Sequence, residues 1–343
     1  MKEVLARVAP GGAVSDSPRA IFGASGRWAT ERFIKALKEG RPLTASELRT
    51  NELLFEDEWK VIDNAIIEAA TLRLRGVADL IGAGLVKPIG NAIAKTVYEY
   101  FKGSDMDPAI VSLDGVTRSE NDRMEQTSAA MPLPITHKDF YLNLRLLAAS
   151  RLSGEGLDTS YLRVCGTKIA EETERMLFQG GKTFGGLTIY GYTTHPQRNT
   201  TAYGTGGAWT GTKTGEQILA DILAWIGIMN ADRRYGPFWV YVSSANNIFI
   251  QNDFKAASDK SIRERILEIP EISDIRVSEF LPSGAIVVVD PQPEVVQMLD
   301  GESLQSVQWD AHGGFEVHFK AWQILLPLIR ADYAGRSGIL HIS

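Results

Sequence analysis

The residues of this chain that could do chemistry are few, and their spacing argues against catalysis. The 343 residues include one cysteine, Cys165, and five histidines. A single cysteine excludes an intrachain disulfide and a multi-cysteine zinc site. No histidines have the His-x-x-x-His spacing of a helical zinc site. His312 and His318 lie six residues apart around a glycine pair, and ordinary placement in a loop and a strand is favoured over metal binding.

Two glycine-containing stretches resemble phosphate-binding loops, and each lacks a required residue. Residues 181–183 are Gly-Lys-Thr, but Met176 stands where a phosphate-binding loop needs its first glycine. Residues 204–209 begin like a dinucleotide-binding fingerprint, but Trp209 replaces the third glycine. No Gly-x-Ser-x-Gly elbow is present. The sequence therefore predicts no enzyme, no catalytic residue, no cofactor and no metal, with a soluble hydrolase built on the loop 182–215 as an alternative.

The most regular element is a helix predicted over residues 157–179, which the glycines at 180 and 181 would end by adopting positive φ. Four residues at mostly three- and four-residue steps form its apolar stripe: Leu162, Cys165, Ile169 and Met176. Five charged residues are expected largely off this stripe: Arg163, Lys168, Glu171, Glu174 and Arg175. Such a helix is expected to lie along a sheet or another helix, and Cys165 is expected to be a buried, inert thiol.

Two β-prone segments, 91–101 and 122–135, flank a polar tip at 102–121. The first alternates loosely and has no continuous hydrophobic face. This pattern predicts a long two-stranded arm. Because an isolated hairpin is marginal in water, contacts with other chains are expected to stabilise it.

The remaining pattern is that of a mixed α+β protein. Thr214 and Gln217 fit a capping box at the start of a helix. Helices are predicted at 57–74, 246–254, 261–269 and 294–299, strands at 238–243, 275–281, 285–290, 308–310 and 315–325, and an irregular connector at 182–215.

Charge is distributed unevenly along the chain. The net charge is −6, but residues 1–50 contain nine Lys and Arg against five Asp and Glu, which gives +4 and leaves −10 for the rest. A solvated arm and an arm that contacts nucleic acid both fit this excess. No apolar run approaches the roughly 20 residues needed to span a bilayer, and no signal sequence is recognised. A protein without membrane contact, made in the cytoplasm, is expected.

The order of elements resembles a known family. A basic arm, a helix and a long hairpin precede Leu-Pro-Ile-Thr-His-Lys-Asp-Phe at 133–140, Leu-Asp-Thr at 157–159 and Ala-Glu-Glu-Thr-Glu-Arg-Met-Leu-Phe-Gln-Gly at 170–180. This arrangement resembles the major capsid proteins of tailed bacteriophages with the Hong Kong 97 fold, and the encapsulin shell proteins related to them. The resemblance covers nearly the whole chain and is most specific from about 132 to 192.

The resemblance implies a domain organisation. Residues 1–51 would be an N-terminal arm and 92–135 an extended loop hairpin that reaches over a neighbouring subunit. A peripheral domain would combine 52–91 and 136–213, with the helix 157–179 as its spine. Residues 214–309 would form an axial domain, and 310–343 would return to the peripheral domain.

The resemblance also implies a function. The chain would be a structural protein that self-assembles as pentamers and hexamers into an icosahedral shell around phage double-stranded DNA, in a virion assembled in the host cytoplasm. Portal, scaffolding and decoration proteins would be further partners. An encapsulin-type compartment that encloses a cargo enzyme is the alternative within the same fold.

Individual residues are assigned to these contacts as expectations. Those expected at subunit interfaces are Trp28, Phe33, Leu37, Tyr98, Tyr100, Phe101, Lys102 and Met106. Those expected to face DNA are Arg7, Arg19, Arg27 and Arg32. Some members of the family crosslink a loop lysine to a neighbour, and Lys102 is the candidate donor here, with an ordinary solvated lysine as the alternative. No N-terminal processing is expected.

Overall fold

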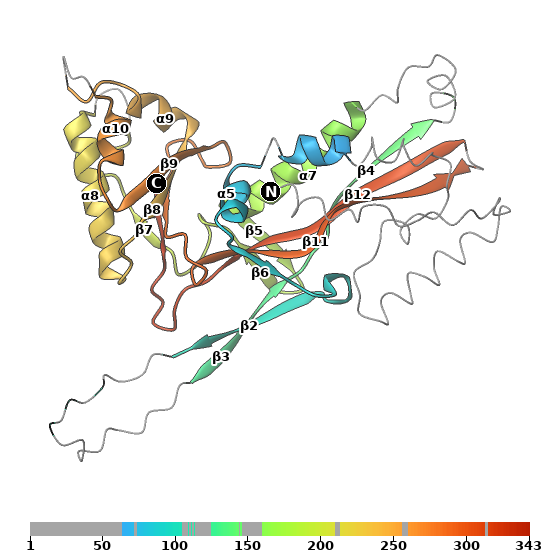
Figure 1. Cartoon of the computed structure of the whole chain (residues 1–343), viewed down its shortest axis with the longest axis horizontal. Coiled ribbons are helices and arrows are strands. Elements are labelled where there is room, and N and C mark those ends of the chain that lie inside the picture. The colour runs from blue at the N-terminus through green and yellow to red at the C-terminus, as the bar shows by residue number, and fades with distance from the viewer. Residues whose placement is uncertain are drawn as a thin grey trace. The chain divides into compact units, whose positions relative to one another are not determined.

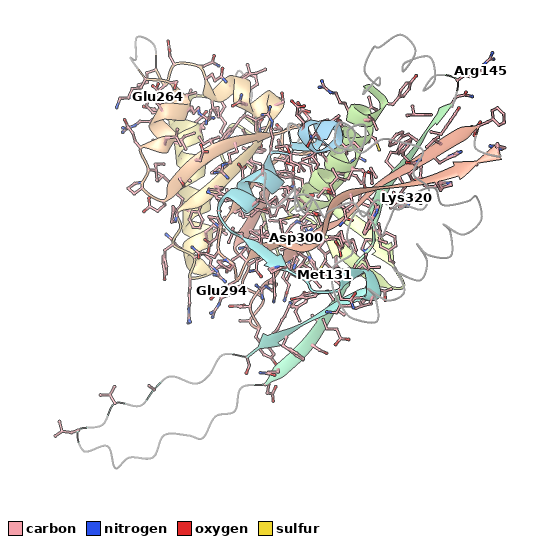
Figure 2. All side chains as sticks on the ribbon, turned by 45° about the vertical axis from the view of Figure 1, so that its right-hand side comes forward. Met131, Arg145, Glu264, Glu294, Asp300 and Lys320 are labelled. Atoms are coloured by element: carbon pink, nitrogen blue, oxygen red, sulfur yellow. The ribbon has the colours of Figure 1, made fainter. Side chains whose placement is uncertain are left out.

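The computed structural model describes residues 64–71, 74–104, 109, 111, 113, 125–143, 145, 160–209, 213–255, 260–312 and 315–343. These residues form a mixed α+β structure, as predicted (Figure 1). The chain divides into two compact units. The described residues of the first lie within 64–96, 133–177 and 298–327, and those of the second lie within 97–132, 178–297 and 328–343. The side chains of the described residues are drawn in Figure 2.

The first unit is built on a four-stranded sheet with the order β1-β11-β12-β4. Its strands are β1 (Val86–Pro88), β4 (Thr136–Asn143), β11 (Val296–Ala311) and β12 (Glu316–Ile329). β1 pairs in parallel with β11, and β4 pairs antiparallel with β12. Its helical segments are residues 64–71, α5 (Gly76–Gly82), the 3₁₀ turn η1 (Ala92–Ala94) and α7 (Ser160–Phe178).

The long helix α7 is present within the predicted range. The four residues of the predicted apolar stripe, Leu162, Cys165, Ile169 and Met176, are each at most 3% exposed. After the helix, Gly180 and Gly181 have φ of 56° and 81°, the left-handed values that end a helix. Gly166 allows a close approach to the helix at 64–71, because a Cβ there would lie 2.3 Å from the Ile66 carbonyl oxygen.

The second unit is built on a five-stranded sheet with the order β7-β13-β10-β8-β9. These strands are β7 (Asn199–Thr201), β8 (Phe238–Ser243), β9 (Ile272–Ser278), β10 (Ile286–Val289) and β13 (Ile339–Ile342). The unit also holds α8 (Gly215–Ala231), α9 (Ser244–Ile250) and α10 (Ile262–Leu267). Two ribbons complete it, β2 (Val97–Gly103) with β3 (Gln126–Pro132), and β5 (Gly180–Phe184) with β6 (Leu187–Tyr190).

The core of the second unit lies between the helices and one face of this sheet. Alternate residues of β8, Phe238, Val240 and Val242, belong to one buried cluster with Trp225 and Met229 of α8. All six residues of β8 are buried, which explains its continuous apolar sequence. The predicted capping box is confirmed, because the Thr214 hydroxyl accepts from the Gln217 N–H and the Gln217 side chain accepts from the Thr214 N–H.

Several predicted elements were wrong. The helix predicted at 294–299 covers the start of β11, where Val296, Met298 and Leu299 are all fully buried. A strand buried on both faces lacks alternation, and its apolar run was mistaken for a helix turn. The first hairpin strand begins later than predicted, at Val97, because Asn91 takes a left-handed φ of 53° and η1 follows it.

The connector predicted at 182–215 contains regular structure. β5 and β6 form a hairpin in which Phe184 pairs with Leu187 across Gly185 and Gly186. Both glycines have positive φ, 57° and 82°, as a two-residue type I′ turn requires. The Gly-Gly pair was the available signal for this hairpin. Residues just after the helix predicted at 57–74 form a further helix, α5.

Candidate functional site

The first candidate site is the β2–β3 ribbon, whose two faces differ. Alternate residues of β2, Tyr98, Tyr100 and Lys102, are half-buried, whereas Val97, Glu99 and Phe101 are exposed. The register places Tyr98 opposite Met131 and Phe101 opposite Ser128. Phe101 is 66% exposed. Among the described tip residues, Val111 and Leu113 are almost fully exposed.

The half-buried face of the ribbon is anchored to other residues of the second unit. The rings of Tyr98 and Tyr100 stack with centroids 6.4 Å apart. The Lys102 amine donates a hydrogen bond of 3.1 Å to Gln197 Oε1. Burial raises the pKa of Tyr100, and the positive charge of Arg330 partly opposes the rise. Contacts within the chain therefore partly bury one face of the ribbon, and the other face is exposed to solvent.

His195 lies close enough to Lys102 for the lysine charge to affect the pKa of the imidazole. The side chain is 4% exposed, and its Nδ1 is a buried atom without a hydrogen-bond partner. Burial, with the positive charges of Lys102 and Arg198, lowers the pKa of His195 to about 4. The imidazole is neutral at neutral pH, as suits a structural histidine.

The other residues predicted at interfaces or facing DNA lie outside the described residues: Trp28, Phe33, Leu37, Met106, Arg7, Arg19, Arg27 and Arg32. The structure brings together Tyr98, Tyr100 and Lys102 on one face of β2 and turns Phe101 to the opposite face.

A second candidate surface comprises exposed apolar side chains beside the helices of the second unit. Leu223 of α8 is 55% exposed, Ile248 of α9 is 66% exposed and Tyr235, after α8, is 68% exposed. Single exposed apolar residues are common. These three belong to residues 214–309, the segment that the sequence resemblance implies is an axial domain.

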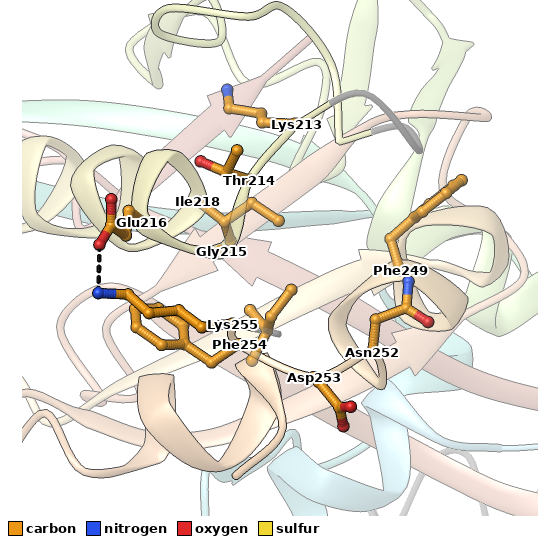
Figure 3. A pocket seen from close by; sticks show the side chains of 11 residues that line it. Lys213, Thr214, Gly215, Glu216, Ile218, Phe249, Asn252, Asp253, Phe254 and Lys255 are labelled. Atoms are coloured by element: carbon orange, nitrogen blue, oxygen red, sulfur yellow. Dashed lines mark ion pairs between the residues drawn. The ribbon is translucent and has the colours of Figure 1, made fainter. Parts of the chain in front are cut away.

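A pocket of about 700 Å³ lies at the start of α8, where Glu216, Lys255 and Phe254 contribute to its lining (Figure 3). Glu216 and Lys255 form an ion pair of 2.6 Å. Lys213 points away from that pair, since its amine donates 2.6 Å to the buried carboxylate of Asp221. The described residues that line this pocket include no histidine, cysteine or serine.

Cys165 is buried, as predicted. Its Sγ donates to the Lys138 carbonyl oxygen at 3.5 Å, and burial is the main cause that raises its pKa to about 12. Such a thiol stays protonated and is a poor nucleophile.

Glu174 was expected largely off the apolar stripe of the helix, yet its side chain is buried. It is 1% exposed, and its carboxylate accepts from the Gly76 N–H at 2.5 Å and the Val77 N–H at 3.1 Å. The acceptor thus satisfies the first amides of α5, 98 and 97 residues away in the sequence. Nothing in the helical spacing of Glu174 pointed to so distant a partner.

Within the part of the chain that the structure describes, no helix is both long and apolar enough to cross a membrane.

Comparison with known proteins connects this geometry to shell proteins. Residues 49–342 match a family of unknown function, DUF6260. A curated relative, the type 1 encapsulin shell protein EncA of Myxococcus xanthus, is 27% identical over 197 residues. That alignment covers 55% of this chain and 61% of the relative, so the chain matches less than two thirds of the relative's length.

Solved structures share the fold at low sequence identity. A virus-like particle from Pyrococcus furiosus has a TM-score of 0.59 at 15% identity, covering 84% of this chain and 100% of that chain. The capsid of Myoviridae phage XM1 has a TM-score of 0.57 at 11% identity, covering 72% of this chain and 85% of that chain. The capsid of an empty GTA particle has a TM-score of 0.54 at 14% identity, covering 78% of this chain and 90% of that chain. The fold is that of Hong Kong 97-type capsid and shell proteins, as the sequence resemblance predicted.

Proposed function

The chain belongs to the DUF6260 family, and we propose that it is a structural subunit that assembles as pentamers and hexamers into a closed icosahedral shell. The exposed face of the β2–β3 ribbon is the observation that carries the proposal. Val97 and Phe101 lie on that face, and Val111 and Leu113 lie beyond it, with their side chains open to solvent. A two-stranded ribbon gains its stability from what it packs against, and only one of the two faces of this ribbon is anchored by its own chain.

The ribbon is therefore proposed to be the extended loop, with residues 92–135 lying over an adjacent subunit. Exposed aromatic side chains such as Phe101 are the type that forms energetic anchors in interfaces. The half-buried face, held through Lys102 and Gln197, would fix the direction in which the loop leaves its subunit.

The axial contacts are proposed to come from residues 214–309. Leu223, Tyr235 and Ile248 would meet copies of the chain around fivefold and sixfold centres. The same surface must meet its neighbours at slightly different angles in pentamers and hexamers, and separated contacts tolerate this better than one continuous patch.

Double-stranded DNA is the proposed content of the shell. Residues 1–50 carry a net charge of +4 on a chain whose other residues sum to −10. Arg7, Arg19, Arg27 and Arg32 of this segment would face phosphate groups without reading base sequence. In this reading the chain is a major capsid protein of a tailed phage, found in the virion, and portal, scaffolding and decoration proteins are its further partners.

A compartment that encloses a cargo enzyme is the second candidate. Similarity to the EncA shell protein over 197 residues is the specific observation in its favour. Both candidates predict the same closed shell, so the contents distinguish them.

Particles purified from the native source test the content directly. They are treated with nuclease and protease, then opened, and the protected nucleic acid and protein are measured. Protected genome-length double-stranded DNA supports the capsid. A single co-purifying protein with only background nucleic acid supports the compartment and contradicts enclosure of DNA.

The role of the ribbon is tested by Phe101→Ser, with Phe184→Ser as the matched control. Phe184 is an exposed phenylalanine, 46% accessible, on the other two-stranded ribbon. Phe101→Ser should reduce the yield of closed particles while the subunit still folds, and Phe184→Ser should reduce it less. Equal particle yields for wild type and Phe101→Ser would contradict the assigned contact.

A further inference from the structure

Two histidines and a glutamate converge at the turn between β11 and β12. His312 lies just after β11, and Glu316 and His318 lie on β12 two residues apart, so they share a face of the strand. His312 Nδ1 is 3.0 Å from Glu316 Oε2, and His318 Nε2 is 3.3 Å from the same oxygen. One ligand atom from each residue lies within 4.8 Å of the others.

We propose that His312, Glu316 and His318 bind a divalent transition-metal ion of the zinc class. Two imidazole nitrogens and one carboxylate oxygen form a ligand set that suits zinc, and three protein ligands leave one position open. Ligand atoms about 2.0–2.2 Å from a tetrahedral zinc ion lie about 3.3 Å from one another. Both separations between a histidine nitrogen and the carboxylate are already close to this value.

Neighbouring aromatic rings orient His318 for this role. In the sheet, Tyr141 of β4 stands directly opposite His318, with ring centroids 5.6 Å apart. Trp309 of β11 stacks on the imidazole at 5.4 Å and 20°. His318 is only 25% exposed, so its nitrogen is held in place before an ion arrives.

His312 supplies the adjustable ligand. Its side chain is 74% exposed, and its backbone φ of 51° places it in the left-handed region at the turn. Rotation of this exposed ring can bring the third ligand separation from within 4.8 Å to the tetrahedral value without disturbing packed residues.

A lysine further along β12 is paired with a different carboxylate. Lys320, labelled in Figure 2, lies two residues beyond His318 and pairs with Asp139 at 3.5 Å, and its amine lies 5.9 Å from the Trp309 ring centre. Glu316 Oε2 faces the two imidazole nitrogens, and an ion would bind between these three atoms. Such an ion would link the end of β11 to the start of β12, whatever the proposed shell encloses.

Metal titration of the full chain tests the site. Protein stripped with EDTA and dialysed is titrated with Zn²⁺ by calorimetry, and with Co²⁺ by visible absorption, which reports coordination geometry. We expect one ion per chain. His312→Ala and Glu316→Gln should each weaken binding at least about tenfold, because each removes one of three ligands.

His137→Ala is the matched control. His137 Nδ1 also lies near a carboxylate, 3.5 Å from Asp139, and its side chain is half-exposed. This variant should bind Zn²⁺ like the wild type, and Zn²⁺ should raise the Tm of both but not that of His312→Ala. No stoichiometric binding by the wild type, or equal binding by His312→Ala and Glu316→Gln, would overturn the proposal.

Discussion

The carboxylate of Glu174 accepts a 2.5 Å hydrogen bond from the backbone N–H of Gly76, which begins α5 98 residues earlier in the chain. The buried acceptor lies on α7 and serves the first turn of α5, where amides have no partner within their own helix. Burial is the largest cause that raises the pKa of Glu174, to about 7, and the hydrogen bonds from Val77 and Gly76 oppose it. This contact ties two helices of the first unit together.

Glu174 should make stability depend on pH. Its pKa rises from 4.5 to about 7 on folding, so the folded protein binds this proton more tightly than the unfolded chain. The stabilisation is present in full below about pH 4.5 and is lost as the pH rises through about 7, a change on the order of 3 kcal/mol. Thermal unfolding between pH 4.5 and 8 measures it.

Glu174→Gln should remove this part of the pH dependence, because the amide does not titrate. Glu68→Gln is the control, since Glu68 is an exposed residue 3.7 Å from Arg163. The interpretation fails if the Tm of Glu174→Gln keeps the same slope with pH as the wild type.

His195 should make the protein sensitive to acid. Its pKa falls from 6.5 to about 4 on folding, so the unfolded chain takes up the proton first. The stability that the neutral ring contributes is present above about pH 6.5 and is lost as the pH falls toward 4. His195→Gln should reduce the change of Tm with pH between these two values. Substitution of the half-exposed His137 by Gln should not reduce it. Parallel curves for wild type and His195→Gln would contradict this.

Gly166→Ala should destabilise the contact between α7 and the helix at 64–71. The new Cβ would lie 2.3 Å from the Ile66 carbonyl oxygen, and forcing the helices apart should cost about 1–3 kcal/mol. Gly227→Ala in α8 is the control, because nothing lies within 4 Å of its Cβ and alanine favours helix by up to about 1 kcal/mol. A higher Tm for Gly166→Ala would show that the helices are not this close.

The buried pair of Lys213 and Asp221 should behave as a unit. Asp221 Oδ2 accepts from the Lys213 amine at 2.6 Å and from Trp209 Nε1 at 2.9 Å, and both charged side chains are at most 4% exposed. Asp221→Ala leaves a buried ammonium unpaired and should cost about 3–5 kcal/mol. Denaturant unfolding of the variants measures this cost.

Lys213→Met with Asp221→Leu should recover much of that loss, because no charge is left unpaired. Glu216→Ala, which breaks an exposed pair with Lys255 at 2.6 Å, should cost only about 0–1 kcal/mol. If the double variant is as unstable as Asp221→Ala, the pair does not act through its charges.

The parts of the fold that could be predicted depend on interactions between residues close together in the sequence. The helical stripe of Leu162, Cys165, Ile169 and Met176 and the capping box at Thr214 depend on neighbours within a few residues, and both are present in the structure. The order of elements was enough to indicate the fold through its resemblance to capsid proteins. What was missed depends on distant partners. β11 is a strand because β1 and β12 flank it, and its own apolar run does not distinguish a buried strand from a helix.

The candidate sites were less predictable. The sequence singled out Tyr98, Tyr100, Phe101 and Lys102 together, but strand alternation places Phe101 on the face opposite the other three. His312 and His318 were set aside because their six-residue spacing fits no helical metal motif. The pairing of β11 with β12 accompanies the approach of both to the carboxylate of Glu316, a relationship that a search for helical spacing does not find.

Electron microscopy of the full-length protein expressed alone, with sedimentation velocity on the same sample, tests the proposed shell most directly. Closed particles of uniform size, or sheets and tubes built from the same rings, are the predicted result, with Phe101→Ser giving fewer of them. A single small species at every protein concentration and ionic strength would contradict the proposal that this chain builds a shell.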